Sequence, residues 1–419
     1  MATRCPPSRW GPGWAKAPRY SRLISCTIQR EGATGAEPWP HDAHGRVGDL
    51  AGQQLHGTVA LYLVLPRGRA PLVLNHSHTM PTVALGTWLG NSSTVQSPYI
   101  LYYPGRVPLV VLNDGRTMPT VALGTWLGNS STGRIVPVGY ETEQAVMWAF
   151  EAGYRHIDTA WTYHVEDQVG RAVKTVVDIF VTTKLWNDAH ARRAVVRALR
   201  ASLAQLRLSY VDLYLMHWPL GQFANGSYDS THYVETWQGM MAARARNLTR
   251  SIGVSNFNQD MLENIRMHQL TTPAVLQIEW NINLQQPELL AYCRQHNISV
   301  MGYTPFGALM NKQRADSPTR IDDPQLTKMA YGKNVPQILL RYAVEMGVTP
   351  IPKSITSSRI FENIDIFDFH LDESDKRTLR GFDRGYRTVP QLKWRDHPFY
   401  PFEKINTFFM STEKLVRNK

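Results

Sequence analysis

Cysteine is scarce in this chain of 419 residues, and the three that occur, Cys5, Cys26 and Cys293, lie far apart. Their spacing suits no metal site, and an odd number cannot all pair within one chain. Such usage is typical of a reducing compartment, so we expect a cytoplasmic protein without a bound metal. Long apolar runs are also lacking, since no stretch approaches the roughly 18 uncharged residues that a membrane span needs. The sequence therefore predicts no membrane partner.

Acidic side chains are absent from the first 30 residues, which carry six Lys or Arg. This arm has no clear amphipathic period, so we expect residues 1–107 to form a disordered extension rather than a targeting peptide or a nucleic-acid surface. Binding of nucleic acid by the arm remains a weak hypothesis that rests on charge alone.

One run occurs twice: residues 79–94 and residues 117–132 both read TMPTVALGTWLGNSST. The second copy follows Asn113-Asp114-Gly115, a strong turn signal between two β-like runs, and leads into the first helical pattern. The second copy is therefore assigned to the fold. The first copy is interpreted as a duplicate that forms no strand of the fold. The alternative is that it can replace the second copy as a strand.

From residue 108 onward, short runs of Val, Ile and Leu alternate with longer amphipathic segments. Eight strands are predicted, at 120–126, 156–160, 178–186, 211–218, 250–256, 274–280, 299–305 and 348–354. Helical patterns between them include 141–154, 190–206, 286–297 and 336–347. Eight such units in one chain predict a (β/α)8 barrel. The alternative is an open doubly wound sheet, but that fold favours a Gly-x-Gly-x-x-Gly turn after an early strand, and none is present.

Four ionisable residues lie at, or just after, the carboxyl ends of predicted strands: Asp158, Tyr163, Lys184 and His217. In a barrel these ends meet on one face. A lysine ammonium lowers the pKa of a nearby tyrosine, a carboxylate keeps the lysine charged, and a histidine can hydrogen-bond a substrate oxygen. Such a set can protonate a carbonyl oxygen, but it supplies no electrons, so a hydride-bearing cofactor is required.

Residues 351–363 carry a cofactor signal after the eighth strand. Lys353 and Ser354 are followed by helix-cap candidates from Thr356 onward and then by Arg359. Helix N-termini attract anions, and two cations there indicate an extra phosphate, hence NADP. A solvated basic helix start is an equally good interpretation of this stretch alone.

These motifs resemble the aldo-keto reductase family over about residues 108–404. The resemblance is carried by GYRHIDTAWTYHVEDQVGRA, DIFVTTKLW, VDLYLMHWP, SIGVSNFN and IPKSITSSRIFEN, in this order. It implies a monomeric (β/α)8 TIM barrel, with an N-terminal β-hairpin and a C-terminal loop, that reduces aldehydes and ketones with NADPH. The implied domains are an extension at 1–107, the barrel at 108–405 and a tail at 406–419.

The resemblance also implies roles for individual residues. The catalytic tetrad is Asp158, Tyr163, Lys184 and His217, with Tyr163 as the proton donor. The cofactor-binding residues are Thr125, Asp158, Ser255, Asn256, Gln277, Tyr303, Lys353, Ser354, Arg359, Glu362 and Asn363. The substrate-binding residues are Trp126, Trp186, His217 and Trp218, and a C-terminal loop at 386–402 helps to set substrate choice.

The chain departs from the family pattern in three places. The connection before Asp178 is short, the stretch Glu279–Asn283 replaces one that usually contains His-Pro, and Asn247 stands where a helix-ending Gly is common. The leading hypothesis remains an NADPH-dependent carbonyl reductase with a small aldehyde or ketone substrate. The alternative is a catalytically weak NADPH-binding scaffold or regulatory subunit.

Overall fold

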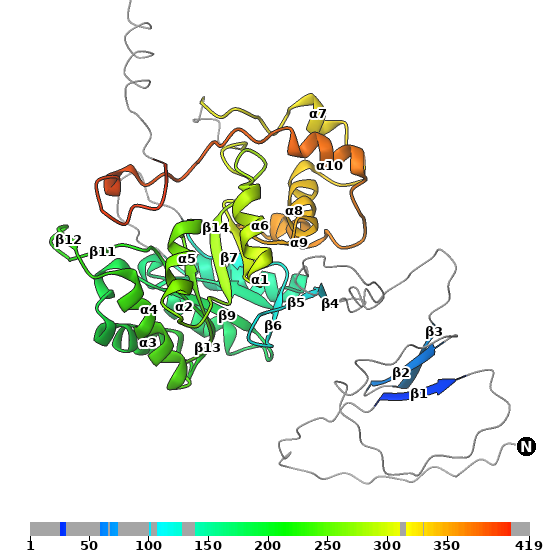
Figure 1. Cartoon of the computed structure of the whole chain (residues 1–419). Helices are drawn as coiled ribbons and strands as arrows, with labels where there is room; N and C mark the ends of the chain where they lie inside the picture. The colour runs from blue at the N-terminus through cyan, green and yellow to red at the C-terminus, as the bar shows by residue number, and fades with distance from the viewer. Residues whose placement is uncertain are drawn as a thin grey trace, which may run out of the picture. The chain divides into compact units, whose positions relative to one another are not determined.

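The computed structural model describes residues 107–127, 139–310, 316–329 and 331–403 in full, and four further strands by their backbones (Figure 1). Two compact units divide the chain, Met1–Pro81 and Thr82–Lys419. Both the first copy of the repeated run and the predicted tail at 406–419 lie outside the described residues.

The first unit contains a three-stranded antiparallel sheet formed by β1 (Cys26–Arg30), β2 (Val59–Leu65) and β3 (Gly68–Val73). These strands fall within the extension that the sequence predicted to be disordered. The boundaries and the disorder of residues 1–107 stay predictions, since most of that segment is not described.

Eight parallel strands form the barrel, in the order β16-β15-β14-β13-β10-β9-β8-β7. Their bounds are Leu123–Gly124 (β7), His156–Asp158 (β8), Phe180–Leu185 (β9), Val211–Met216 (β10), Thr249–Ser255 (β13), Val275–Glu279 (β14), Ser299–Tyr303 (β15) and Val348–Ile351 (β16). Backbone hydrogen bonds from Ala122 to Pro350 and from Gly124 to Pro352 join the two ends of the sheet. The predicted barrel is confirmed, and each strand falls within or overlaps its predicted range.

Helices cover the outside of the barrel (Figure 1). They are α1 (Glu141–Ala152), α2 (Glu166–Val173), α3 (Arg192–Leu206), α4 (Tyr233–Ala245), α5 (Gln259–Met267), α6 (Pro287–Gln295), α7 (Pro324–Thr327), α8 (Val335–Glu345), α9 (Ser357–Ile364) and α10 (Glu373–Arg380). Short 3-10 helices lie at Trp161–Tyr163 (η2), Asn187–Ala189 (η3) and Leu392–Trp394 (η4). The sequence determines where α1 ends, because Gly153 adopts the left-handed conformation, at φ 104°, and this conformation stops the helix.

A β-hairpin closes the end of the barrel where the strands begin. It is made of β5 (Leu109–Val111) and β6 (Thr117–Pro119), and β4 (Ile100–Leu101) pairs with its outer edge. The turn between them holds the barrel through two side chains: Asn113 donates to the carbonyl of Pro273 at 2.9 Å, and Asp114 accepts from Ser251 at 2.6 Å. The predicted turn at Asn113-Asp114-Gly115 is therefore confirmed, and the second copy of the repeat supplies β6 and β7.

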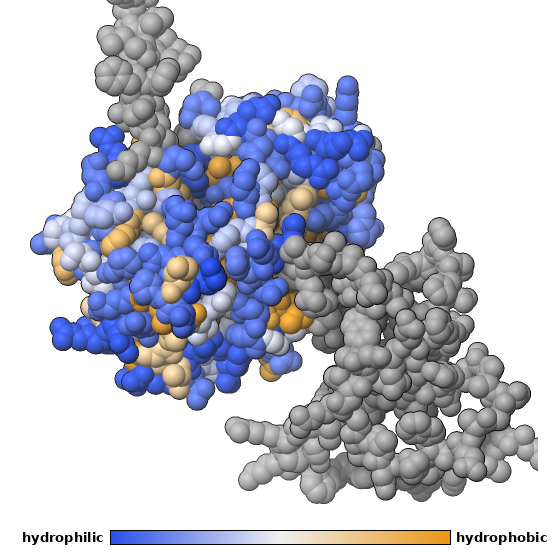
Figure 2. All heavy atoms as spheres, viewed as in Figure 1, coloured by the Kyte–Doolittle hydropathy of each residue, from blue (hydrophilic) through white to orange (hydrophobic). Residues whose placement is uncertain are grey.

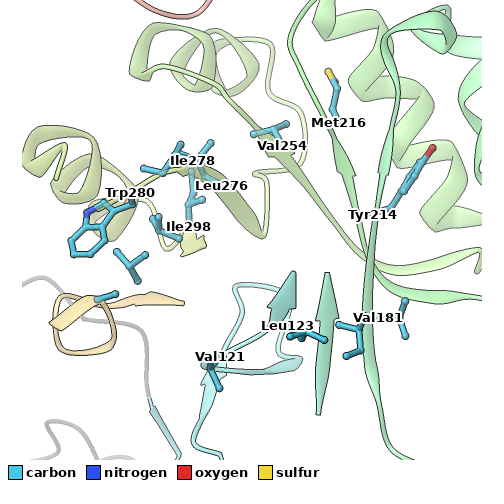
Figure 3. Close-up of a cluster of buried hydrophobic side chains, with 14 of the residues drawn as sticks. Val121, Leu123, Val181, Tyr214, Met216, Val254, Leu276, Ile278, Trp280 and Ile298 are labelled. Atoms are coloured by element: carbon cyan, nitrogen blue, oxygen red, sulfur yellow. The ribbon is translucent and has the colours of Figure 1, made fainter. Parts of the chain in front are cut away.

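Buried apolar side chains from successive strands hold the barrel and its helices together. Figure 3 shows part of this core, with Leu123, Val181, Tyr214, Val254 and Leu276 coming from five of the eight strands. All five are at most 2% exposed, as expected for parallel strands that are covered on both faces. The surface in Figure 2 is by contrast mostly hydrophilic over the helices. Among the described residues, no helix combines the length and the apolar character that crossing a membrane requires.

Left-handed backbone appears at two of the positions where the chain departs from the family pattern. Asp178, in the short connection between α2 and β9, has φ 59°, and Asn247, after α4, has φ 56°. Asn and Asp tolerate this region better than other residues with a Cβ. The short connection is thus compatible with an intact β9.

Close packing of α2 on α3 depends on a residue without a side chain. A Cβ on Gly170 of α2 would lie 2.3 Å from the carbonyl oxygen of Leu206 at the end of α3. We expect Gly170→Ala to destabilise the barrel by about 1–3 kcal/mol, because two backbones must separate. Urea denaturation followed by circular dichroism measures this loss. Gln205→Ala is the control: Gln205 is an exposed residue of α3, so its variant should change stability by less than about 0.5 kcal/mol.

Candidate active site

A pocket of about 440 Å³ opens where the barrel strands end. All eight strands contribute to this region, since the pocket is lined by residues at or next to their carboxyl ends. The strand-end residues are Gly124, Thr125, Trp126, Asp158, Trp186, His217, Trp218, Asn256, Gln277, Tyr303, Ile351 and Lys353. The predicted convergence of separate strands on one face is therefore observed.

A buried ion pair lies at the base of the pocket. Nζ of Lys184 is 2.6 Å from Oδ1 of Asp158 and also donates to the carbonyl of Thr159 at 2.9 Å. Lys184 is fully buried and Asp158 is 3% exposed. Burial lowers the pKa of Lys184, whereas the Asp158 carboxylate acts in the opposite direction. Gln277 donates to the second carboxylate oxygen of Asp158 at 2.8 Å, so both oxygens have a partner.

Tyr163 stands above this pair, in the 3-10 turn η2 that follows β8. Its ring centroid lies 5.1 Å from Nζ of Lys184 and 5.7 Å from the ring of His217. Burial, and then the Asp158 carboxylate, raise the pKa of Tyr163 well above its ordinary value. The expected lowering of this pKa by Lys184 is outweighed by burial and by the Asp158 charge. Tyr163 carries its proton at neutral pH.

His217 follows β10 and is a neutral imidazole. Burial, and then the Lys184 charge, lower the pKa of His217 well below its ordinary value. Its ring lies 5.2 Å from that of Trp186, edge to face. Within the described part of the chain, Nδ1 of His217 has no hydrogen-bond partner. This nitrogen is buried, but the His217 ring as a whole is 9% exposed and lines the pocket, where a ligand can reach it.

Amide and hydroxyl groups connect the other walls of the pocket. Asn256, at φ 60° after β13, donates to the carbonyl of His217 at 2.9 Å and to the Ser255 hydroxyl at 3.1 Å. The Tyr303 hydroxyl donates to Oδ1 of Asn256 at 2.7 Å. The Thr125 hydroxyl donates to the carbonyl of Asp158 at 3.0 Å. The structure thus brings together these predicted residues around the buried ion pair.

The predicted phosphate-binding residues lie at one end of the site. Lys353 lines the pocket, and Ser354 accepts at its hydroxyl from the backbone N–H of Thr356 at 3.0 Å. Thr356 is the N-cap of α9 but makes no side-chain hydrogen bond to it. Arg359, Glu362 and Asn363 belong to α9 and do not line the pocket; Arg359 and Glu362 are exposed, and Asn363 is buried.

Aromatic side chains form the opposite wall. Trp126 is 43% exposed at the rim, whereas Trp218 is buried. Trp394, in η4 of the C-terminal loop, packs with its ring centroid 5.0 Å from that of Trp218 and 6.0 Å from that of Trp186. The three predicted tryptophans line the pocket. Trp394, which the sequence analysis did not name, packs against Trp186 and Trp218.

Several lining residues escaped the sequence analysis. Thr304, Pro305, Phe306 and Gly307 follow β15, and Val389, Gln391 and Lys393 come from the C-terminal loop. The first group had a detectable signal, since Pro305 ends the strand predicted at 299–305 and Gly307 follows two residues later, which indicates a turn. Thr304 and Gly307 both have positive φ. The second group lies in the loop at 386–402 that the family resemblance links to substrate choice, but nothing local shows which residues of that loop face the pocket.

Glu166, behind β9, carries a buried carboxyl on the helix side of the barrel. It is 3% exposed and accepts from the Thr183 hydroxyl at 2.5 Å. Burial raises the pKa of Glu166 from 4.5 to about 7, although the hydrogen bonds of Thr183 and Ser202 and the charge of Lys184 act against this rise. A carboxyl in this position favours its neutral form.

The raised pKa of Glu166 predicts a pH-dependent stability. Its contribution is fully present below the unfolded pKa of 4.5 and is lost as the pH rises through about 7. A shift of this size corresponds to about 3 kcal/mol. Glu166→Gln removes the titration, so its free energy of unfolding relative to the wild type should rise by up to this amount between pH 5 and pH 8, measured by urea denaturation. Glu151→Gln, at an exposed position of α1, is the control: its free energy of unfolding relative to the wild type should not change with pH. The prediction is contradicted if the value for Glu166→Gln does not change with pH either.

Fold and pocket together define a (β/α)8-barrel protein whose site lies at the carboxyl ends of its strands. Residues 120–384 match the Aldo/keto reductase family, and this range is more than half of the chain. The chain belongs to this family, which confirms the resemblance that its motifs indicated.

Individual relatives agree with this assignment. The chain is 46% identical to aldo-keto reductase AKR2E4 of Bombyx mori over 272 residues, which are 62% of this chain and 88% of the relative. It is 40% identical to human aldo-keto reductase family 1 member A1 over 294 residues, covering 62% and 90% of the two chains.

Solved structures extend the comparison to the fold. The crystal structure of Bombyx mori AKR2E4 in complex with NADP is 45% identical, with a TM-score of 0.68, and the match covers 71% of this chain and 99% of that one. The crystal structure of AKR2E5 complexed with NADPH is 39% identical, with a TM-score of 0.69, covering 72% and 95%.

Proposed function

We propose that this protein reduces aldehydes or ketones to alcohols with NADPH, and that Tyr163 donates the proton. One observation carries the proposal: Tyr163 and His217 face one pocket above the buried Asp158–Lys184 pair. The family assignment and the relatives with bound NADP or NADPH support the same chemistry.

The residues present fit the cofactor. Asn256, Gln277 and Tyr303 line the pocket close to the ion pair, where a nicotinamide ring and its amide group find hydrogen-bonding and aromatic partners. Lys353 and Ser354 lead into α9, whose N-cap Thr356 makes no side-chain hydrogen bond to the helix. The first N–H groups of a helix attract phosphate. We assign Thr125, Ser255, Arg359, Glu362 and Asn363 to cofactor binding with them, on the strength of the family motifs.

Proton delivery follows from the electrostatics of the site. When bound, NADPH supplies the hydride that reduces the carbonyl carbon. Tyr163 gives its proton to the carbonyl oxygen as negative charge develops there, and the neutral His217 orients that oxygen by a hydrogen bond. The Lys184 ammonium, 5.1 Å from the Tyr163 ring, then stabilises the phenolate, while Asp158 holds Lys184 in place. Carbonyl carbon and oxygen thus gain one hydride and one proton, which makes the alcohol.

The pocket wall indicates an apolar carbonyl compound. Trp126, Trp186 and Trp218 offer aromatic surface next to His217, and Val389 and Phe306 add further apolar groups. Desolvation of a flat or branched apolar substrate against these rings is favourable.

Tyr163→Phe tests the proposed proton donor. The variant keeps the ring but lacks the acidic proton, so turnover of aromatic aldehydes should fall by a factor of about 10² to 10⁴. NADPH oxidation followed by absorbance measures turnover, and fluorescence titration should show an almost unchanged Kd for NADPH. Tyr210→Phe, at the opposite end of β10, is the matched control and should retain full activity. Unchanged turnover in Tyr163→Phe would remove Tyr163 from the mechanism, and no turnover by the folded wild type would favour the scaffold alternative.

Arg359→Ala tests the choice of cofactor. If the exposed Arg359 pairs with the additional phosphate of NADPH, its loss removes a charge-assisted contact that NADH never makes. We expect the Kd for NADPH to rise by a factor of about 10 to 100, and the Kd for NADH by much less. Arg193→Ala, an exposed arginine of α3, is the control and should change neither value. Equal losses for the two cofactors would contradict the assignment.

A further inference from the structure

The C-terminal loop, residues 386–402, forms one wall of the proposed substrate pocket (red in Figure 1). Val389, Gln391 and Lys393 line the pocket, and Trp394 packs behind its aromatic wall. A loop of this kind contributes binding energy to a substrate only if it is held in place, because ordering a free segment costs conformational entropy. The question is which contact holds the lining part of the loop.

Glu279, the last residue of β14, makes that contact. Its side chain is completely buried. One carboxylate oxygen accepts from the backbone N–H of Thr388 at 2.6 Å, and the other accepts from the backbone N–H of Val389 at 2.9 Å. Burial raises the pKa of Glu279, and these two N–H groups act against the rise. The interaction joins the barrel directly to the residue that lines the pocket.

Other attachments of the loop bond residues that do not themselves line the pocket. Asn283 accepts at its carbonyl from the backbone N–H of Tyr386 at 2.9 Å, before the lining part begins. Asn258 donates to the carbonyl of Pro401 at 3.2 Å, after it ends. Trp394 donates to Gln222 at 3.2 Å, beyond the lining residues Val389 and Gln391. Glu279 alone among these attachments bonds the lining residue Val389 itself.

We propose that Glu279 positions the C-terminal loop over the pocket and thereby sets which carbonyl substrates the enzyme accepts. The proposal rests on the function proposed above. Two neighbouring N–H groups that point at one place need two acceptor oxygens. A carboxylate has two such oxygens, and its negative charge strengthens both hydrogen bonds. Strand β14 pairs Glu279 with Tyr303 of β15, so the loop is tied to the strands that also carry the proposed cofactor residues. Glu279 is a positioning residue, since it acts through Val389 and its neighbours.

Backbone amide exchange tests the attachment without any substrate. Glu279→Gln is nearly isosteric, but it offers one acceptor oxygen and turns an NH2 group toward the second N–H donor. In full-length protein, hydrogen–deuterium exchange of the peptide containing Thr388 and Val389 should accelerate by about tenfold or more. Glu345→Gln is the matched control: Glu345 is also a mostly buried carboxylate that accepts a backbone N–H, from Leu371, but it lies in α8. Its variant should leave exchange in the loop unchanged.

Kinetics then tests the effect on substrates. A bulky carbonyl such as biphenyl-4-carbaldehyde needs the loop wall, whereas propanal needs only the groups at the base of the pocket. Glu279→Gln should raise KM for the bulky aldehyde by about tenfold or more, with KM for propanal changed by less than about threefold. The Kd for NADPH is measured alongside, because Glu279 neighbours Tyr303. Parallel losses for both aldehydes would overturn the specificity role.

The two readouts separate failure of this inference from failure of the proposed function. If the wild type reduces no carbonyl compound, the proposed function fails, while exchange still reports whether Glu279 holds the loop. Unchanged exchange in Glu279→Gln overturns the inference even if the enzyme is active. If Glu279→Gln does not fold, Glu279→Asp replaces it: it keeps the charge on a shorter side chain, and loop exchange at the wild-type rate would again overturn the inference.

Discussion

The buried pair of Asp158 and Lys184 is the constraint on which the site depends. Removing one member of such a pair leaves an uncompensated charge in the barrel, which typically costs about 3–5 kcal/mol. Three strands hold the pair in place: Asp158 ends β8, Lys184 lies in β9, and Gln277 of β14 donates to the second carboxylate oxygen of Asp158. Stability and chemistry are thus coupled at one point of the fold.

The protonation states of the neighbouring groups follow first from burial and then from the charges of this pair. Burial keeps the proton on Tyr163, and the negative charge of Asp158 adds to that effect. The same burial, with the positive charge of Lys184, keeps His217 neutral. A protonated phenol and a neutral imidazole facing one pocket are suited to donate a proton and to orient an acceptor. The protein therefore prepares the site before any ligand binds, which is the least costly way to stabilise a developing charge.

Around this centre, three buried carboxylates have different partners. Asp158 is ion-paired and Glu279 binds backbone N–H groups. Glu166 is buried behind β9 with a hydroxyl partner, and it has no ion pair among the residues that the structure describes. Their surroundings differ accordingly: charge compensates charge in the first case, and dipoles compensate burial in the others. The C-terminal loop, although remote in sequence, becomes part of the pocket because one of these carboxylates holds it.

Much of this protein is determined by local sequence. The alternation of apolar runs with amphipathic segments predicted all eight barrel strands, and the turn at Asn113 identified the copy of the repeat that belongs to the barrel. The strand-end positions of Asp158, Lys184 and His217 predicted their convergence, because barrel topology alone brings such ends together. Only the tertiary structure decided the direction of the Tyr163 pKa, since burial and charge pairing are sums over distant atoms. It likewise decided the bond between Glu279 and the C-terminal loop, which joins residues about a hundred positions apart and leaves no local pattern in the chain.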